Sequence, residues 1–299
     1  MLELVKSLNG YLWNVILIVL LCGTGIYYTF RLKFIQVRRF TEGFKLVFGN
    51  FSLKGHKHEN GAMTPFQSIS TAIAAQVGTG NIAGAATAVM SGGPGAIFWV
   101  WMSAVFGMAT VYAEATLAQN FKTTVNGEVT GGPVYYIKQA FKGNFGKFLA
   151  GFFAVSLILA LGFMGNMVQS NSIGSAFVSV FESRGISIPP IAIGILVAVL
   201  AGFIFLGGTK RLAGVVEKVV PIMALIYIIG GLIVLVCNFT HIPAVFKMIF
   251  VGAFSPQGVA GGVFGVTVQQ AIRYGVARGL FSNEAGMGST PHAHALANV

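Results

Sequence analysis

Residues 74–84, with the sequence AAQVGTGNIAG, are the part of the chain best suited to binding a small charged ligand. Gly78 and Gly80 stand beside Thr79 and Asn81, and each glycine costs about 1 kcal/mol in a helix interior. The composition therefore predicts an interrupted helix, whose freed N–H groups suit a carboxylate and whose freed carbonyl groups suit a cation. Close packing of these small residues against a neighbouring helix is the alternative, and both interpretations stay open here.

The elements that must position this stretch are membrane helices. Of the 299 residues, 55% are hydrophobic and 9% are charged, whereas soluble domains carry about 25% charged residues. Uncharged stretches of 24 to 28 residues occur four times, and two longer stretches contain 34 and 54 residues. A helix needs about 20 apolar residues to cross a bilayer. We predict seven spans, at 11–30, 66–91, 95–117, 147–180, 190–207, 219–239 and 257–281.

The distribution of basic residues predicts an orientation in the membrane. Lysine and arginine cluster in the connections 31–64, 118–146 and 208–218, which the positive-inside rule places in the cytoplasm. The N-terminus is then outside and the seventh span ends inside, and we expect a bacterial plasma membrane. Two short segments, 134–142 and 241–255, are expected to lie at the membrane surface. The fourth span is longer than a bilayer requires, which predicts a steep tilt.

Other functional classes fit the sequence poorly. The formal charge is +11, but the basic residues lie between the spans, which argues against a nucleic-acid partner. The chain has no aspartate, no HExxH or GxSxG motif and no paired carboxylates, so we expect no enzyme. Cys22 and Cys237 fall in separate spans and are expected to be small apolar residues. His292 and His294 lack acidic or cysteine neighbours for a metal centre.

Five sequence blocks carry a specific resemblance: GTGNIAGAATA, GGPGAIFWVWMSA, YAEATLAQ, GEVTGGPVYYI and RGLFSNEAGMGS, between residues 78 and 289. Together they closely resemble the alanine or glycine:cation symporter family, within the amino acid–polyamine–organocation superfamily. The resemblance implies an all-α integral membrane protein with the inverted-repeat bundle of the bacterial leucine transporter. It implies a single transmembrane domain over 1–299, with a peripheral helix at 11–30, a first repeat at 66–239 and the start of a second at 257–299. The second and seventh spans would both be discontinuous.

The resemblance also implies that the interruption holds substrate and ion together. The amides of Thr79 and Gly80 would bind the substrate carboxylate. The carbonyl oxygens of Ala74 and Val77 would be ligands of a sodium ion, a hard cation that suits oxygen ligands. The substrate-binding residues of this region would be Gln76, Gly78, Thr79, Gly80 and Asn81. Thr79 stands where the leucine transporter has leucine, so its hydroxyl group would join the site.

Two further spans contain candidate substrate contacts. Asn166 and Gln169 share a face of the fourth span, where polar amides at the bilayer centre need partners. They line the substrate pocket or only hydrogen-bond to neighbouring helices, and both interpretations stay open. In the seventh span, glycines at 261–265 favour a second interruption. The residues that would then face the site are Phe264, Thr267 and Gln270.

Glu114 is the only acid deep in an uncharged run of the sequence. An intramembrane carboxylate is a functional candidate. Its position near the end of the third span favours a structural or gating pair with Arg273 or Arg278. A proton relay is the alternative.

We therefore expect sodium-coupled symport of a small neutral amino acid, alanine or glycine, by alternating access. The expected partners are the amino acid, the sodium ion and the lipid bilayer, with no cofactor besides the ion. Coupling to protons is one alternative, and a channel or a structural membrane subunit is another. A ten-helix core of two repeats needs four helices more than are predicted here. We accordingly expect an incomplete chain that does not transport by itself.

Overall fold

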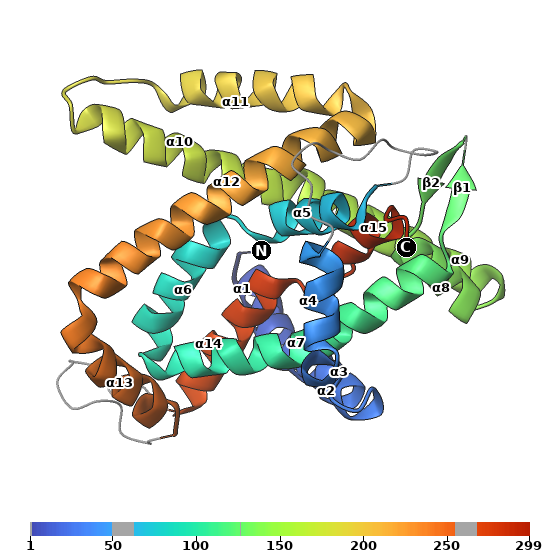
Figure 1. The fold of residues 1–299 in the computed structure, drawn as a ribbon, viewed down its shortest axis with the longest axis horizontal. Coiled ribbons are helices and arrows are strands. Elements are labelled where there is room, and N and C mark those ends of the chain that lie inside the picture. The colour runs from blue at the N-terminus through green and yellow to red at the C-terminus, as the bar shows by residue number, and fades with distance from the viewer. Residues whose placement is uncertain (1, 50–62, 126, 255–267) are drawn as a thin grey trace. The chain divides into compact units, whose positions relative to one another are not determined.

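The computed structural model describes residues 2–49, 63–125, 127–254 and 268–299, which are mostly helical (Figure 1). The π-helical segments η1 (Leu12–Ile16) and η2 (Ile158–Gly165) each join two α-helices, and the 3-10 turn η3 (Phe239–His241) precedes α13. The antiparallel strands β1 (Thr123–Val125) and β2 (Glu128–Thr130) are an exception to the predicted all-helical fold. The helices are α1 (Leu2–Tyr11), α2 (Leu17–Arg31), α3 (Ile35–Arg38), α4 (Phe40–Phe48), α5 (Pro65–Gln76), α6 (Thr79–Gly92), α7 (Gly95–Asn120), α8 (Pro133–Ala140), α9 (Gly143–Leu157), α10 (Asn166–Glu182), α11 (Pro190–Phe205), α12 (Gly208–Cys237), α13 (Ile242–Phe254), α14 (Val268–Asn283) and α15 (Thr290–Ala295).

Several described helices are suited to a membrane. Three are long and apolar enough to cross one: Gly95–Asn120, Gly143–Glu182 and Gly208–Cys237. Shorter apolar helices lie at Leu17–Arg31, Pro190–Phe205 and Phe239–Phe254. These ranges overlap predicted spans or surface segments, so an integral membrane protein is confirmed in outline. The number of spans and the inverted repeat remain predictions.

The predicted fourth span is one continuous helical stretch. It covers Gly143–Glu182, or 40 residues, and includes the π-helical segment η2. At about 1.5 Å per residue it is about 60 Å long, twice the thickness of a hydrocarbon core. A helix of this length fits a bilayer only if it is steeply tilted or extends beyond it.

Two predicted connections contain more structure than expected. Residues 208–218, predicted as a connection, are the first turns of α12, so this helix begins before the predicted span at 219–239. The basic side chains there do not oppose helix formation, because lysine and arginine have high helix propensity. The connection 31–64 contains the short helices α3 and α4.

The described residues form two compact units, each considered by itself. The first takes in residues within 1–53, 75–116 and 222–290. The second takes in residues within 54–74, 117–221 and 291–299. The boundary at residues 74 and 75 falls inside α5.

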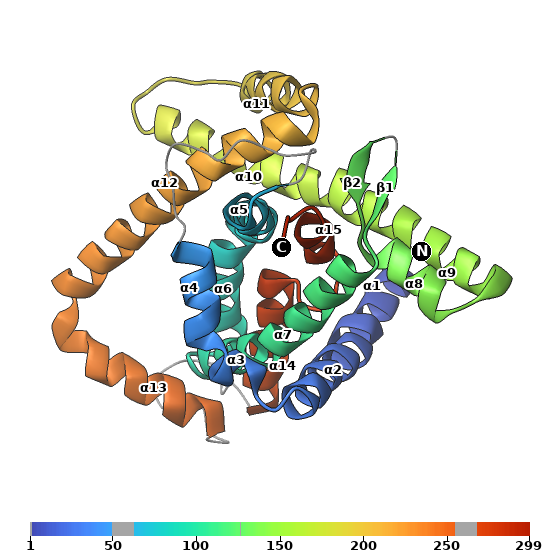
Figure 2. The ribbon, with the colours of Figure 1, turned by 45° about the vertical axis from the view of Figure 1, so that its right-hand side comes forward.

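In the first unit, α14 packs closely against both α6 and α7 (Figures 1 and 2). Gly275 allows the approach to α7, because a Cβ atom there would overlap the carbonyl oxygen of Ala96 and lie 2.7 Å from Cβ of Trp99. Backbone atoms cannot move aside as a side chain can, so the position requires glycine. This contact places α14 directly on α7.

Helix α6 presents a stripe of small residues to α14. A Cβ atom at Gly80 would lie 2.9 Å from the Phe281 ring, and one at Gly92 would lie 3.1 Å from Cβ of Tyr274. Residue numbers rise along α6 as they fall along α14, so the two helices are antiparallel. Close packing by small residues, the alternative interpretation of the glycines, is therefore present in the structure.

In the second unit, residues 291–299 are held by three separate segments. Met63 forms a parallel bridge with Ala297, and the Ser68 hydroxyl donates a hydrogen bond of 2.9 Å to the carbonyl oxygen of Ala293. The Gln119 amide donates to the carbonyl of Ala297 at 3.1 Å. The ring of His292 lies against Gly132, and its Nδ1 atom is 3.1 Å from the carbonyl oxygen of Gly131.

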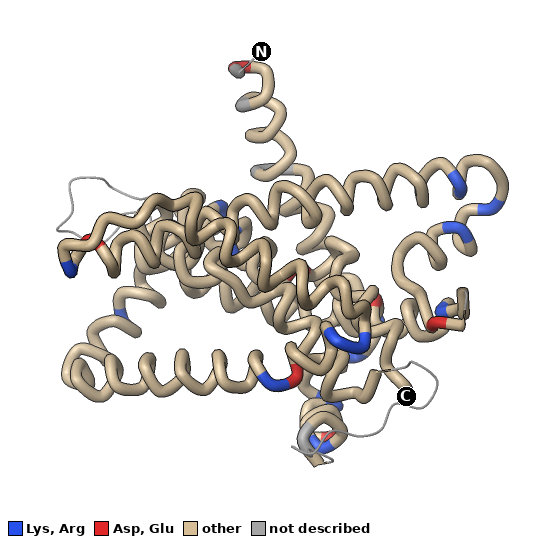
Figure 3. Tube along the Cα trace, turned by 90° about the horizontal axis from the view of Figure 1, so that it is seen from above, with Lys and Arg blue, Asp and Glu red and all other residues tan. Residues whose placement is uncertain are grey.

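Charged residues leave long helical stretches bare, as Figure 3 shows. Helix α11 and the second half of α12 carry no charged residue and expose most of their apolar side chains. A surface of this kind is suited to lipid tails and not to water.

Candidate substrate and ion site

The predicted interruption of the second span is confirmed. Helix α5 ends at Gln76 and α6 begins at Thr79, while Gly78 between them is extended, with φ −142° and ψ −165°. The last carbonyl groups of α5 and the first N–H groups of α6 therefore lack partners within their own helices. Both kinds of group meet within a few residues, as a site for an anion and a cation requires.

Asn81 stabilises the start of α6. Its Oδ1 atom accepts a hydrogen bond of 2.9 Å from the Gly78 N–H, as an N-cap residue and its third neighbour do in a capping box. Its Nδ2 atom donates to Oγ of Ser282 at 2.6 Å. Asn81 thus connects the interruption to the end of α14, a structural role that was not predicted. Its expected role as a substrate-binding residue stays a prediction.

The end of α14 and the segment after it contact both sides of the interruption. On the α5 side, Nε2 of Gln76 donates to Oγ1 of Thr290 at 2.7 Å. On the α6 side, the Phe281 ring covers Gly80, and the Trp13 ring lies 6.1 Å from that of Phe281. Residues 281–290 therefore hold the two half-helices in place.

The loop 283–289 has its own polar contacts. The Gly286 N–H donates a hydrogen bond of 3.0 Å to Oε2 of Glu114, so this carboxylate binds a backbone amide and not the predicted arginine. The Ser289 hydroxyl donates to the Glu284 carboxylate. Burial raises the pKa of Glu284, and the Ser289 hydrogen bond lowers it by a smaller amount. The loop thus brings a second carboxylate close to Thr290.

Comparison with known proteins identifies the family of the chain. All of the chain, residues 1–299, matches the model of the sodium:alanine symporter family. The chain belongs to this family. The resemblance drawn from the five blocks is confirmed, and the names of the family and of its members are those of transporters.

Named relatives share about two fifths of their residues with the chain. The sodium/alanine symporter AgcS of Methanococcus maripaludis is 42% identical over 301 residues, which cover 99% of the chain and 63% of that protein. A probable sodium/glutamine symporter of Bacillus subtilis, GlnT, is 41% identical, with 99% and 59% covered. The amino-acid carrier protein AlsT of the same organism is 39% identical, with 99% and 60% covered. The chain spans about 60% of the length of these relatives.

Three of the other predicted site residues of this sodium:alanine symporter family member fall on described helices. Asn166 and Gln169 are on α10 in the second unit, and Nδ2 of Asn166 donates to the carbonyl of Gly162 in its own helical stretch at 2.9 Å. Gln270 is on α14 in the first unit. Phe264 and Thr267 lie outside the described residues.

Sequence reasoning missed Phe281, Ser282 and Thr290 as neighbours of the interruption. Phe281 and Ser282 belong to the family block RGLFSNEAGMGS, and Thr290 follows it directly. The block was used only to recognise the family. The available signal was that polar residues occur in two different family blocks, since a polar residue in a membrane protein needs a hydrogen-bond partner.

Proposed function

We propose that this chain binds a small neutral amino acid, alanine or glycine, together with a sodium ion, as part of a symporter that works by alternating access. The observation that carries the proposal is the interruption between Gln76 and Thr79, held by residues 281–290. Membership of the sodium:alanine symporter family supports it. The name of AgcS points to alanine and sodium as ligands. The name of GlnT points to sodium and glutamine, whose side chain is larger than that of alanine.

The substrate carboxylate binds at the start of α6. The Thr79 and Gly80 amides, at the first two positions of the helix, are the proposed donors. The positive end of the helix dipole adds to the attraction. The Thr79 side chain borders the same position and contributes its hydroxyl group.

The sodium ion binds at the end of α5. The carbonyl groups of Ala74 and Val77 are at or beyond the last turn of this helix, where carbonyls lack intrahelical partners. Carbonyl oxygen is a suitable ligand for a hard cation. An ion there reduces the repulsion between the substrate carboxylate and the negative end of α5, which makes binding of the two ligands cooperative.

Thermal unfolding of the purified chain in lipid nanodiscs tests this site. We expect L-alanine to raise the unfolding temperature by several degrees in sodium chloride and not in potassium chloride, because a ligand at 100 times its Kd stabilises by about 2.7 kcal/mol. Thr79→Trp abolishes the response by filling the site. Thr87→Trp, an exposed position on the same helix, is the control and retains it. A response equal in both salts contradicts sodium coupling, and no response to alanine or glycine contradicts the substrate assignment.

Proton coupling is the second candidate, and the contact of Glu114 with Gly286 favours it. Glu114 is in α7, and its carboxylate accepts a hydrogen bond from the loop after α14. Protonation of this carboxylate would therefore act on the segment that holds the interruption. Glu114→Gln should then remove the pH dependence of alanine binding while keeping binding itself. Unchanged pH dependence in this variant excludes Glu114 as the coupling group.

A further inference from the structure

The chain makes a fixed corner directly after α2. Lys33 and Phe34 both have left-handed backbone conformations, with φ of 54° and 55°. The Phe34 N–H donates to the carbonyl of Thr29 at 2.8 Å, and Nε2 of Gln36 donates to the buried Thr29 hydroxyl at 3.1 Å. Left-handed conformations are costly for residues other than glycine. The hydrogen bonds to Thr29 stabilise the corner and fix the direction in which α3 and α4 leave α2.

Helix α4 has an apolar face on which two phenylalanines are exposed. Phe40, Phe44 and Val47 repeat at i, i+4 and i+7, which puts them on one side of the helix. The rings of Phe40 and Phe44 stack with centroids 6.4 Å apart, yet their side chains are 66% and 55% exposed. Glu42 and Lys45 lie on the opposite side. The helix is strongly amphipathic and shows its apolar side to its surroundings.

This apolar face continues the surface of α2. The rings of Phe30 on α2 and Phe34 at the corner meet edge to face, with centroids 5.3 Å apart. Tyr27 and Phe30 are themselves exposed on α2, and Val37 is exposed on α3. Exposed apolar side chains therefore run from α2 through the corner to α4.

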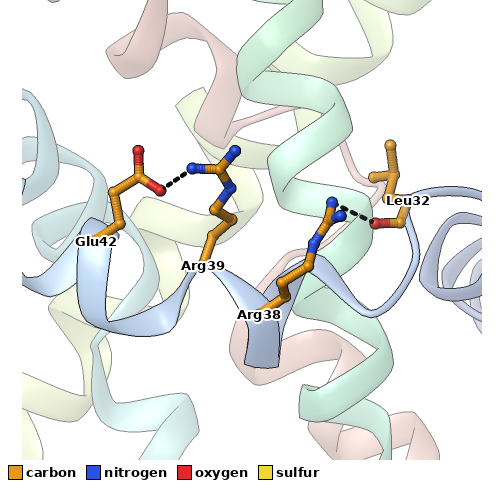
Figure 4. Close-up of polar contacts among 4 residues, drawn as sticks. All are labelled: Leu32, Arg38, Arg39 and Glu42. Atoms are coloured by element: carbon orange, nitrogen blue, oxygen red, sulfur yellow. Dashed lines mark hydrogen bonds and ion pairs between the residues drawn. The ribbon is translucent and has the colours of Figure 1, made fainter.

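The basic residues of this segment differ in their contacts (Figure 4). Arg39 forms an ion pair with Glu42, while Nη2 of Arg38 is 3.5 Å from the carbonyl oxygen of Leu32. A distance of 3.5 Å is long for a hydrogen bond, so most of the donors of Arg38 remain available. Lys33 and Lys45 are also exposed, and none of these three makes an ion pair within the described chain.

We propose that residues 32–48 lie in the headgroup region of the bilayer and that Lys33, Arg38 and Lys45 bind the phosphates of anionic lipids. The phenylalanine face enters the boundary of the acyl chains, and the basic side chains extend to the phosphates above it. Each basic residue near an anionic surface strengthens the attraction about fivefold. The proposal concerns the anchoring of this segment and does not depend on transport.

Spin labels test the orientation of α4. Cysteine replaces Phe44 or, as the matched control on the opposite face, Glu42, in a chain where Cys22 and Cys237 are changed to serine. In nanodiscs containing phosphatidylglycerol, we expect the label at 44 to be accessible to oxygen and the label at 42 to a water-soluble nickel relaxation agent. Equal access of the nickel agent to both positions overturns the proposal. Protection of position 44 from both agents also overturns it, because protein then covers the face.

Lipid selectivity tests the basic residues. We expect the purified chain to retain phosphatidylglycerol in preference to phosphatidylcholine in native mass spectrometry. Arg38→Gln should reduce this preference about fivefold, and the triple change K33Q/R38Q/K45Q about 100-fold. Arg39→Gln is the matched control, since Glu42 already neutralises Arg39, and should have a much smaller effect. Equal effects of Arg38→Gln and Arg39→Gln, or an unchanged preference in the triple variant, contradict the assignment.

Discussion

At the scale of single residues, Asn81 does most to shape the interruption. One end of its amide caps α6 through Gly78, and the other end binds Ser282, which is 201 residues further along the chain. A polar group in a membrane protein is costly unless it is satisfied. The backbone of the interruption is therefore defined by side-chain hydrogen bonds and not by the glycines alone.

A double-mutant cycle on Asn81 and Ser282 measures this link. We expect Asn81→Ala to lower the free energy of unfolding by about 1–2 kcal/mol, because a cap and a hydrogen bond are lost. Ser282→Ala should cost about 1 kcal/mol, and the double variant less than the sum. The control is Thr87→Ala, whose hydroxyl bonds only to the carbonyl of Gly84 one turn earlier in its helix. Strictly additive losses would show that the two side chains do not interact.

His292 makes the stability of the second unit depend on pH. Burial lowers the pKa of its imidazole, and the hydrogen bond with the Gly131 carbonyl offsets this only in part. Below the usual histidine pKa of about 6.5, the unfolded chain is then more protonated than the folded one, so stability falls as the pH falls. His294 has a pKa lowered by burial as well and acts in the same direction.

We therefore expect the unfolding temperature to drop between about pH 7 and pH 5. His292→Asn should reduce the drop, because asparagine keeps a donor for the Gly131 carbonyl but does not titrate. His241→Asn, at an exposed position in η3, serves as the control and should leave the profile as it is. A pH profile that is the same in His292→Asn as in the parent chain would contradict the role of this residue.

At the scale of elements, glycine decides how closely α14 can approach its neighbours. We expect Gly275→Ala to lower the free energy of unfolding by about 1–3 kcal/mol, because the new methyl group meets the carbonyl oxygen of Ala96. The matched control is Gly23→Ala in α2, where a Cβ atom has no neighbour within 4 Å. That change should be neutral or stabilising by up to about 1 kcal/mol, since alanine favours helix. Equal losses for both variants would rule out the packing explanation.

The boundaries of the helices and strands show which sequence signals were sufficient to predict the secondary structure. Glycine-rich composition predicted the interruption at Val77 and Gly78 correctly, because helix propensity is a local property. The hairpin β1–β2 was missed, although the Asn-Gly pair at 126–127 is a strong hairpin signal. Helix α12 begins before the predicted span at 219–239. Charged residues were used to mark where the span begins, and charge limits a membrane span but not a helix.

At the scale of the whole molecule, the distribution of charge predicts the topology. The turn after α10 and the hairpin β1–β2 should face opposite sides of the membrane. Ser187 and Thr124 are both exposed. Each is changed to cysteine in a chain without Cys22 and Cys237, and the cysteine is labelled with a membrane-impermeant maleimide. We expect position 187 to react in intact cells and position 124 only after permeabilisation. The reverse pattern would invert the predicted orientation.

The sequence by itself determined the membrane class, the place of the interruption and the family. These follow from uncharged length, glycine content and contiguous motifs, all of which are read along the chain. Only the tertiary structure decided what holds the interruption, because Gln76 meets Thr290 across 214 residues and Asn81 meets Ser282 across 201. The pairing of distant polar groups depends on how α14 packs against α6 and α7. That packing cannot be predicted from the spacing of residues in one sequence.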